Sequence, residues 1–532
     1  MKKQLLLLVA FMSVLAFNAQ AQRYLTPQFT GVSKQTTAYG VNYTALTIPV
    51  TGHTFRQPLA VDIYQPTVDT ASRRPLVIFI PTGNFLPKSV RNSPTGDRQD
   101  SIAVEICDRF AKLGYVTASI DYRLGWNPIA STQTERTFTL INAAYRGIQD
   151  ARTAVRFFKA NAASFKIDTT RIMVIGEGTG GYISLGVATF DKYSEVTTTQ
   201  YPQGKFLVPS TTTPGTFVPM VVEQLNGDIE GKTFNRAPAS GTPYPGGDTL
   251  CVPNHVANTS SIALVVNMGG AIGDITWLEA NSTPIISIAA PHDQNAPYRN
   301  GVLGVPIGNG VSLDVVNVQG SHWVSLKMDS LGITDKFKKL KAANDPYKSL
   351  VAARNTAYGF TTGGTYSSSL FPIIGRSRDD SSPYQWWNTD TTKQAFGDNA
   401  SALAGNPGMG KAKATVYIDS IMNFIIPRAC VGLNLPCASL VSSTEELLDP
   451  ATTKLTIAPN PALDIVTFES EVSNPIKAVE IYDLSGRMMI QKLGVNNNML
   501  QINRGTLPSG MYIAKVKFEK GILTQKVVFN QQ

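Results

Sequence analysis

Histidine and cysteine are scarce in this sequence: each occurs only four times among its 532 residues. The Cys-x-x-Cys and His-Glu-x-x-His motifs and histidine clusters, which typically hold zinc, are missing from it. The sequence therefore argues against a zinc site, and we expect no cofactor. Beyond the N-terminus, no apolar run approaches the length of about 18 residues that a membrane-spanning helix needs.

Charge is also sparse, since charged residues make up 16% of the chain. The net charge is +9, but the basic residues are scattered, and the one dense cluster, Lys336–Lys341, lies within a helical pattern. We interpret that cluster as a solvated helix face, and we expect no nucleic-acid partner. The hydrophobic fraction of 43% is ordinary for a globular protein. The length suggests two or three domains.

The N-terminus has the composition of a signal peptide. Lys2 and Lys3 precede an apolar run from Leu5 to Phe17, and Ala19-Gln20-Ala21 follows it. A short basic region, a short apolar core and an Ala-x-Ala site are the three parts of a secretory signal. We therefore expect residues 1–21 to be removed and the mature chain to be exported.

An oxidising compartment permits disulfides. Cys430 and Cys437 lie close together, and a local disulfide between them is the expected pairing. Cys107 shares one face of a predicted helix with Ala103, Ile106 and Phe110, so we expect a buried thiol. Cys251 is either free or paired with Cys107.

Short apolar strand patterns alternate with helical patterns from about residue 57 to residue 323. Such alternation is typical of a mostly parallel sheet with helices on both faces. The predicted helices include Ser101–Leu113 and Ala144–Ala163. The predicted strands are Leu59–Tyr64, Leu76–Ile80, Val116–Ile120, Ile172–Ile175, Ile262–Val266, Ile285–Ala289 and Val315–Val318.

Two long insertions interrupt this alternation. Residues 191–258 are rich in Thr, Pro and Gly, and residues 325–410 begin helically and become irregular and aromatic. Segments of this kind either cap a site or form surface loops. We expect a final helix at Val416–Ile426, a first domain over residues 22–437 and a linker over residues 438–453.

One segment combines a strand, a sharp turn and a helix. Gly176-Glu177-Gly178-Thr179-Gly180-Gly181 follows the strand Ile172–Ile175, in the arrangement of the nucleophile elbow Gly-x-Ser-x-Gly. Here the chain resembles α/β-hydrolases of the carboxylesterase and acetyl-xylan-esterase kind. The segments Val61–Pro66 and Ile120–Gly125, with Asp150-Ala151, resemble the same family. The resemblance implies an α/β-hydrolase fold over roughly residues 57–323 and the final helix.

The resemblance also assigns a catalytic triad. By the family's pattern, Asp293 in Ala290-Pro291-His292-Asp293 is the acid, and His322 in Gly320-Ser321-His322-Trp323 is the base. The nucleophile position is Gly178, which has no side chain, whereas ester hydrolysis by this family needs a hydroxyl that forms an acyl-enzyme. If the family role does not apply, Asp293 and His322 are an ordinary loop carboxylate and a structural histidine.

The oxyanion hole implied by the resemblance uses main-chain amides. One belongs to Thr179, which follows the nucleophile position, and the others belong to the loop Pro81-Thr82-Gly83-Asn84-Phe85, at Gly83 and Asn84. Relatives carry a sequence like His-Gly-Gly-Gly-Phe there, of which only Gly83 and Phe85 match. Because the donors are main-chain N–H groups, the hole tolerates changes of side chain.

Three functions remain open from the sequence. The first is a non-catalytic protein that binds a small ester or acylated polysaccharide, with Trp323 among its ligand-binding residues. The second is an active carboxylic-ester hydrolase in which His322 and Asp293 activate water or another hydroxyl, such as that of Thr179 or Ser184. The third is a purely structural surface protein. Trp386-Trp387 is either a sugar-stacking platform or part of the core.

The last 78 residues or so alternate as strands around turns, which predicts a small all-β sandwich without helices, over residues 454–532. Three motifs occur in order in this segment, Ala458-Pro459-Asn460-Pro461, Val479–Arg487 and Leu507–Tyr512. They resemble the type A sorting domain of the type IX secretion system of Bacteroidetes; the alternative is an ordinary β-sandwich binding module. The resemblance implies that the secretion machinery is a partner and that the protein is secreted or lies at the cell surface.

Overall fold

The computed structural model divides the chain into two compact units, the first ending at Val441 and the second beginning at Ser442. The residues that it describes are 22–210, 212–236, 246–293, 295–308, 311–341, 344–357, 367–373, 382–398, 400, 402–403, 406, 408–442, 448, 453–484, 486–519 and 521–531. The predicted signal peptide and most of the predicted linker lie outside these residues.

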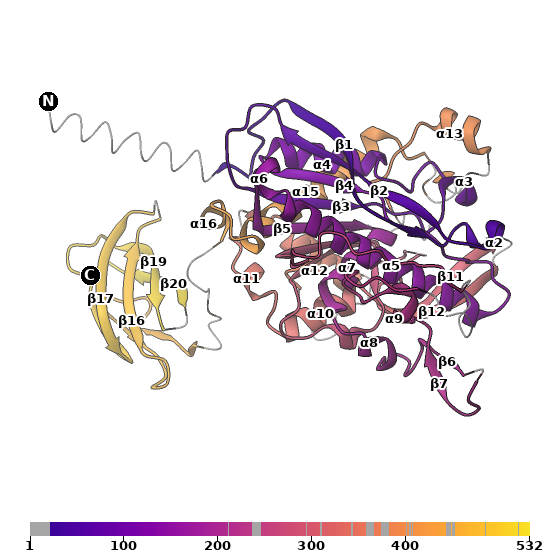
Figure 1. Ribbon diagram of the computed structural model, residues 1–532. Helices are drawn as coiled ribbons and strands as arrows, with labels where there is room; N and C mark the ends of the chain where they lie inside the picture. The colour runs from indigo at the N-terminus through magenta and orange to yellow at the C-terminus, as the bar shows by residue number, and fades with distance from the viewer. Residues whose placement is uncertain are drawn as a thin grey trace. The chain divides into compact units, whose positions relative to one another are not determined.

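An eight-stranded sheet forms the centre of the first unit (Figure 1). Its order is β1-β2-β4-β3-β5-β8-β10-β13, in which β2 pairs antiparallel with β1 and β4, and the remaining neighbours are parallel. The strands are β1 (Val32–Thr44), β2 (Phe55–Pro66), β3 (Arg74–Ile80), β4 (Val116–Ile120), β5 (Ile167–Glu177), β8 (Leu264–Met268), β10 (Ile285–Ala289) and β13 (Leu370–Pro372). Six of the predicted strands are confirmed in this sheet.

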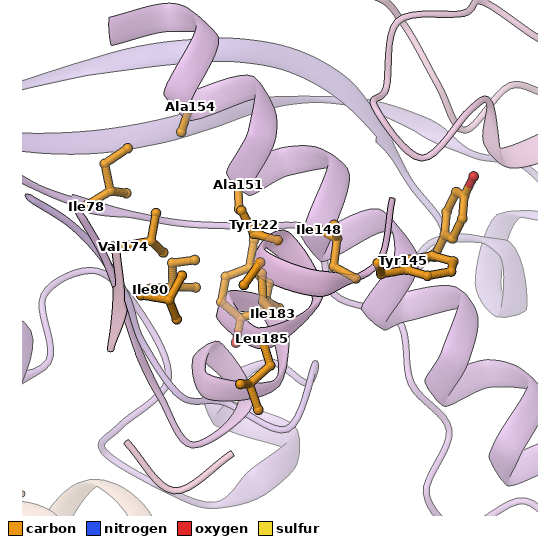
Figure 2. Packing of buried hydrophobic residues seen from close by; sticks show 14 of the residues in the cluster. Ile78, Ile80, Tyr122, Tyr145, Ile148, Ala151, Ala154, Val174, Ile183 and Leu185 are labelled. Carbon is orange, nitrogen blue, oxygen red and sulfur yellow. The ribbon is translucent and has the colours of Figure 1, made fainter. Parts of the chain in front are cut away.

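Helices cover both faces of the sheet because its central strands are apolar on both sides. Ile78 and Ile80 of β3 pack toward α5 and α7, whereas Val77 and Phe79 belong to the cluster that includes α4 and α15. Figure 2 shows Ile78, Ile80 and Val174 beside Ala151 and Ala154 of α5. The helices are α2 (Ile48–Thr51), α3 (Lys88–Arg91), α4 (Ser101–Lys112), α5 (Gln133–Ala160), α6 (Ala162–Phe165), α7 (Thr179–Thr189), α8 (Ser194–Thr197), α9 (Glu223–Asn226), the 3-10 helix η1 (Ile275–Trp277), α10 (Ser321–Ser330), α11 (Asp335–Lys338), α12 (Lys348–Ala357), α13 (Thr389–Phe396), α15 (Lys411–Gly432) and α16 (Ala438–Val441).

Helix α5 begins well before its predicted start at Ala144. The side chain of Thr132 accepts a hydrogen bond of 3.2 Å from the main-chain N–H of Glu135, which caps the helix at its observed start. Residues 438–441, predicted as the beginning of a linker, form α16 and belong to the first unit.

One predicted strand lies in a different sheet. Val315–Val318 is part of β12 (Val311–Gly320), which pairs antiparallel with β11 (Asn300–Gly308) and with β9 (Ala271–Ile272). The last strand of the main sheet is instead β13, within the predicted insertion 325–410. The short apolar run Val315–Val318 fits either arrangement, and only pairing with β11 decides between them. His322, which comes directly after this predicted strand in the sequence, therefore follows β12 and not a strand of the main sheet.

The insertion at 191–258 has little regular structure. It contains α8, α9 and a two-stranded hairpin of β6 (Leu207–Pro209) and β7 (Phe217–Pro219), which projects from the unit in Figure 1. Among the helices that the structure describes, none combines the length and apolarity needed to span a membrane.

The cysteine expectations agree with the structure. Cys430 and Cys437 form a disulfide, and Cys107 is a buried free thiol, as predicted. Cys251 is free and buried as well, which settles the alternative left by the sequence.

The second unit consists of antiparallel strands in two sheets, as predicted. One sheet has the order β14-β15-β18 and the other β17-β16-β19-β20. Their apolar faces form one cluster that includes Val466, Ile481, Val516 and Phe529. The strands are β14 (Thr456–Ala458), β15 (Ile465–Glu469), β16 (Ile476–Tyr482), β17 (Met488–Asn497), β18 (Met499–Asn503), β19 (Gly510–Lys517) and β20 (Ile522–Phe529).

A fully buried ion pair ties the loop after β4 to α5. The Arg123 guanidinium lies 2.8 Å from the Asp150 carboxylate, and the main-chain N–H of Arg123 donates to the same carboxylate at 2.8 Å. Removing one partner leaves a buried charge without compensation. We expect Asp150→Ala to lower the free energy of unfolding by about 3–5 kcal/mol in urea denaturation.

The matched control is Asp398→Ala, which removes a carboxylate from the exposed pair with Lys393. Exposed pairs contribute at most about 1 kcal/mol, so this variant should unfold close to the wild type. Equal effects of the two substitutions would contradict the structural role of the buried pair.

Candidate active site

Four neighbouring parallel strands end at the same edge of the main sheet. The segments that follow β3, β5, β8 and β10 carry Thr82, Gly178, Gly269 and Asp293, and all four residues line one cavity. Ligands of open α/β sheets bind outside the carboxyl ends of the strands, so this edge is where a site is expected.

The turn after β5 has the geometry of a nucleophile elbow. Gly178 has φ of 53° and ψ of −112° and directly precedes α7. A residue with a side chain would be strained in this sparsely populated region, by about 1–3 kcal/mol. The neighbouring Gly180 is sterically required, since a Cβ there would lie 1.9 Å from the carbonyl oxygen of Ile80. The predicted elbow is therefore formed, with glycine at its tip.

The hydroxyl of Thr82 occupies the space that a side chain at residue 178 would need. A Cβ on Gly178 would lie 2.3 Å from Thr82 Oγ1 and 3.0 Å from Thr82 Cβ. The main-chain N–H of Thr179, predicted as an oxyanion donor, donates to Thr82 Oγ1 at 3.4 Å. Thr82 thus fills the space beside the tip of the turn and accepts from a main-chain N–H that the resemblance assigns to the oxyanion hole.

A second threonine accepts from another predicted donor. The main-chain N–H of Asn84 donates to Thr179 Oγ1 at 2.6 Å. Asn84 and Phe85 have φ of 52° and 51°, and Gly83 has φ of 147° and packs against Gly96. The structure therefore brings Gly83, Asn84, Thr179 and Gly178 together, but the amides of Thr179 and Asn84 donate within the protein.

Asp293 and His322, the predicted acid and base, are placed differently. Asp293 lines the cavity and accepts hydrogen bonds from the main-chain N–H groups of Asn295 at 2.6 Å and Ala296 at 3.2 Å. His322 is buried in the first turn of α10, where its main-chain N–H donates to the Tyr298 carbonyl at 3.0 Å and its ring packs on the Tyr298 ring. The hydrogen bonds described for the Asp293 carboxylate come from main-chain N–H groups, and the described lining of the cavity includes Asp293. The roles of Asp293 as acid and of His322 as base remain predictions of the resemblance.

The predicted ligand-binding tryptophan also lies elsewhere. Trp323 packs edge-on against Tyr201, with ring centroids 5.7 Å apart, and does not belong to the described lining of the cavity. Of the other tryptophan pair, Trp387 is buried and lines the cavity, whereas Trp386 lies under the Lys411 ammonium. Ser184 is buried in α7, where its hydroxyl donates to the carbonyl of Gly181.

Glu177 is a buried acid beside the elbow to which sequence reasoning gave no role. Its carboxyl group accepts from the main-chain N–H of Thr82 at 3.4 Å and from the side-chain amide of Gln385. Burial raises the pKa of Glu177 to about 8, and burial likewise raises the pKa of Asp293 to about 7. Two acids of this edge therefore retain protons well above the pH at which an exposed carboxyl group loses them.

The register of β3 and β5, which the structure shows, brings Thr82 next to Gly178. Ile80 pairs with Gly176 in the parallel ladder of β3 and β5, so the residues two positions later lie side by side. The position of Gln385 had no such signal, because it reaches Glu177 from a segment more than 200 residues away in the chain.

The cavity at this edge has a volume of about 650 Å³. Thr82, Gly178, Thr179 and Asp293 line it at the ends of the strands, and we call these four residues its polar floor. Arg91 and Gln385 contribute further polar groups to the lining. A larger part of the wall, which we call the apolar chamber, is hydrocarbon and aromatic. It consists of Trp126, Leu140, Ile141, Ala144, Tyr145, Ile148, Phe190, Phe206, Trp277, Leu303, Val316 and Val318. The volume is in the range of small-molecule sites.

Two family models match the chain. Residues 61–210 match BD-FAE, and residues 456–530 match the secretion system C-terminal sorting domain. The chain carries an esterase-like α/β-hydrolase domain. It also carries a C-terminal type IX secretion sorting domain. No curated protein matches it.

The solved structures similar to this chain include esterases. Esterase 2 of Thermogutta terrifontis phosphorylated by paraoxon is 15% identical, with a TM-score of 0.28, and the match covers 50% of this chain and 73% of that one. The propionate-bound form of the same esterase is 14% identical, with a TM-score of 0.27, and the match covers 50% of this chain and 74% of that one.

The steric conflict at the elbow is testable with a double-mutant cycle. We expect Gly178→Ala to destabilise the protein by more than the conformational strain of about 1–3 kcal/mol, because its Cβ meets Thr82. Thr82→Gly should recover part of that loss in the double variant, measured by urea denaturation. Gly52→Ala is the matched control, since Gly52 has φ of 75° and no atom within 4 Å of an added Cβ. Additive effects of the two substitutions would contradict the conflict.

The raised pKa of Glu177 predicts how stability depends on pH. Because the folded protein holds this proton up to about pH 8 and the unfolded chain releases it near its ordinary pKa of 4.5, stability falls as pH rises between these values. We expect the melting temperature to fall from pH 5 to pH 8, and Glu177→Gln, which mimics the protonated acid, to show a smaller fall. Glu135→Gln, at the exposed start of α5, is the control and should follow the wild type. A wild-type slope in Glu177→Gln would refute the assignment.

Proposed function

We propose that this chain is an exported pseudoenzyme: an esterase-like domain that has lost its nucleophile and binds an ester or other acyl ligand without turning it over. The observation that carries the proposal is the position of the Thr82 hydroxyl, which fills the space of the missing side chain at Gly178 and accepts the Thr179 N–H. Acyl transfer needs both a nucleophile and open oxyanion donors. The proposed loss of catalysis therefore involves both the loop that carries Thr82 and the elbow that carries Gly178.

The cavity supports binding as the retained function. It lies at the edge where the strands end, and it keeps both a polar floor and a large apolar wall. Such a cavity is the usual form of a small-molecule site. The proposal gives His322 a structural role, because it packs on Tyr298 instead of lining the cavity.

Export is the second part of the proposal. The C-terminal sorting domain indicates secretion or a cell-surface location. The predicted signal peptide at residues 1–21 would deliver the chain across the inner membrane before the sorting domain acts. We propose a ligand-binding domain from residue 22 to Val441, where the first unit ends, and a sorting domain over residues 454–532, so that removal of the sorting domain leaves the ligand-binding part intact.

A second candidate is favoured by the same hydroxyl. Thr82 Oγ1 lies close to where a serine hydroxyl would stand, and its hydrogen bond from the Thr179 N–H would stabilise an alkoxide. In this alternative Thr82 is a relocated nucleophile of an active carboxylic-ester hydrolase. The geometry favours it less, since no described hydrogen bond joins Thr82 Oγ1 to a base.

Hydrolysis of p-nitrophenyl acetate and p-nitrophenyl decanoate separates these functions. We expect no turnover by the wild type above the rate of His322→Ala, and none by Gly178→Ser, whose side chain meets Thr82. The variant Gly178→Ser/Thr82→Gly removes that conflict, but because the proposal gives His322 a structural role, we expect this variant not to react with a serine-directed phosphonate either.

Turnover by the wild type that disappears in Thr82→Val would establish the relocated nucleophile instead. Turnover that disappears only in His322→Ala would establish water activation by the predicted base. A wild type that neither hydrolyses nor binds any acyl compound would favour a purely structural protein.

A further inference from the structure

The apolar chamber offers a ligand almost no hydrogen bonds, because its described polar atoms are already used within the protein. The indole N–H of Trp126 donates to the carbonyl of Arg136 at 3.1 Å, and that of Trp277 donates to the carbonyl of Glu195 at 3.1 Å. The Tyr145 hydroxyl donates to the carbonyl of Gly227 at 3.0 Å. These side chains therefore present only ring surface to the cavity.

The rest of the chamber is hydrocarbon and comes from separate elements that converge. Leu140, Ile141 and Ile148 belong to α5, and Val316 and Val318 belong to β12. Tyr145 and Ile148 lie on the same helix in Figure 2. Phe190 stacks on Trp277, with ring centroids 4.8 Å apart, which fixes the aromatic part of the wall.

A sugar hydroxyl placed in such a chamber would lose its hydrogen bonds to water and gain none. Burying a polar group without a partner costs about 1–3 kcal/mol, whereas each buried methylene contributes roughly 0.8 kcal/mol. The chamber therefore selects hydrocarbon over carbohydrate. The polar floor and Arg91 lie in the same cavity, which suits a ligand that is apolar over most of its length and polar at one end.

We propose that the ligand of this site is a fatty acyl compound whose hydrocarbon chain occupies the apolar chamber. This inference rests on the proposed binding function and names the ligand class for it. A free fatty acid and a fatty acyl ester share this chemistry, and the polar end distinguishes them. Acetylated sugar is the competing class.

Tryptophan fluorescence provides a direct readout, since Trp126, Trp277 and Trp387 line the cavity among five tryptophans in the chain. The full chain is titrated with sodium hexanoate, octanoate and decanoate below their micelle concentrations, with methyl decanoate and with acetylated xylotriose. We expect Kd to fall by roughly threefold to fourfold for each added methylene until the chamber is full. Binding of decanoate, methyl decanoate or both supports the assignment of a hydrocarbon chain to the apolar chamber. The ratio of their two Kd values shows which polar end the site prefers.

Ala144→Phe tests the position of the ligand's hydrocarbon chain. Because it adds a ring inside the apolar chamber, we expect the Kd of decanoate to rise at least tenfold and the Kd of hexanoate to change little. Ala160→Phe, at the exposed end of the same helix, is the matched control and should bind like the wild type. Melting temperatures of both variants report whether they are folded.

The outcomes separate this inference from the proposed function. Binding of acetylated xylotriose without any dependence on chain length overturns the fatty acyl assignment and leaves the binding function in place. An unchanged chain-length profile in folded Ala144→Phe also overturns it. Absence of binding by every probe overturns both.

Discussion

The parallel register of β3 and β5 is the constraint on which the site depends. This register places Thr82, which follows β3, beside Gly178, which follows β5. A side chain at residue 178 would therefore need the space that the Thr82 hydroxyl occupies. Two side chains cannot both occupy it. A threonine at one position therefore requires a residue without a side chain at the other, and glycine also relieves the strain of the elbow. The glycine at the tip of the elbow is therefore tied to the threonine in the neighbouring segment.

The surroundings of that pair favour a neutral site. Glu177 and Asp293 are buried with raised pKa values, and their described partners are uncharged amide groups. The ion pair of Arg123 and Asp150, by contrast, is buried with its charges compensated and fixes a loop to α5. The charged pair of Arg123 and Asp150 thus stabilises the scaffold. Burial instead favours the protonated forms of Glu177, beside the elbow, and of Asp293, in the cavity lining.

Much of the fold could be predicted because it depends on local patterns. The apolar runs at Val116–Ile120 and Ile285–Ala289 are strands as predicted, since a buried parallel strand is apolar at every position. The placement of Val315–Val318 could not be predicted, because a short apolar run of this kind does not specify which strand pairs with it. The position of His322 depends on this strand, so His322 lies in the first turn of α10, directly after β12, and not at the end of a strand of the main sheet.

The sequence by itself determined that a glycine-rich turn with Gly178 at its tip follows a buried strand, and that residues 456–530 form a β-sandwich sorting domain. Both follow from the order of residue types along short segments. Only the tertiary structure decided that Thr82 fills the vacant space, that Gln385 reaches Glu177 and that the described polar atoms of the apolar chamber bond within the protein. These depend on contacts between segments distant in the chain, whose distances no local pattern specifies.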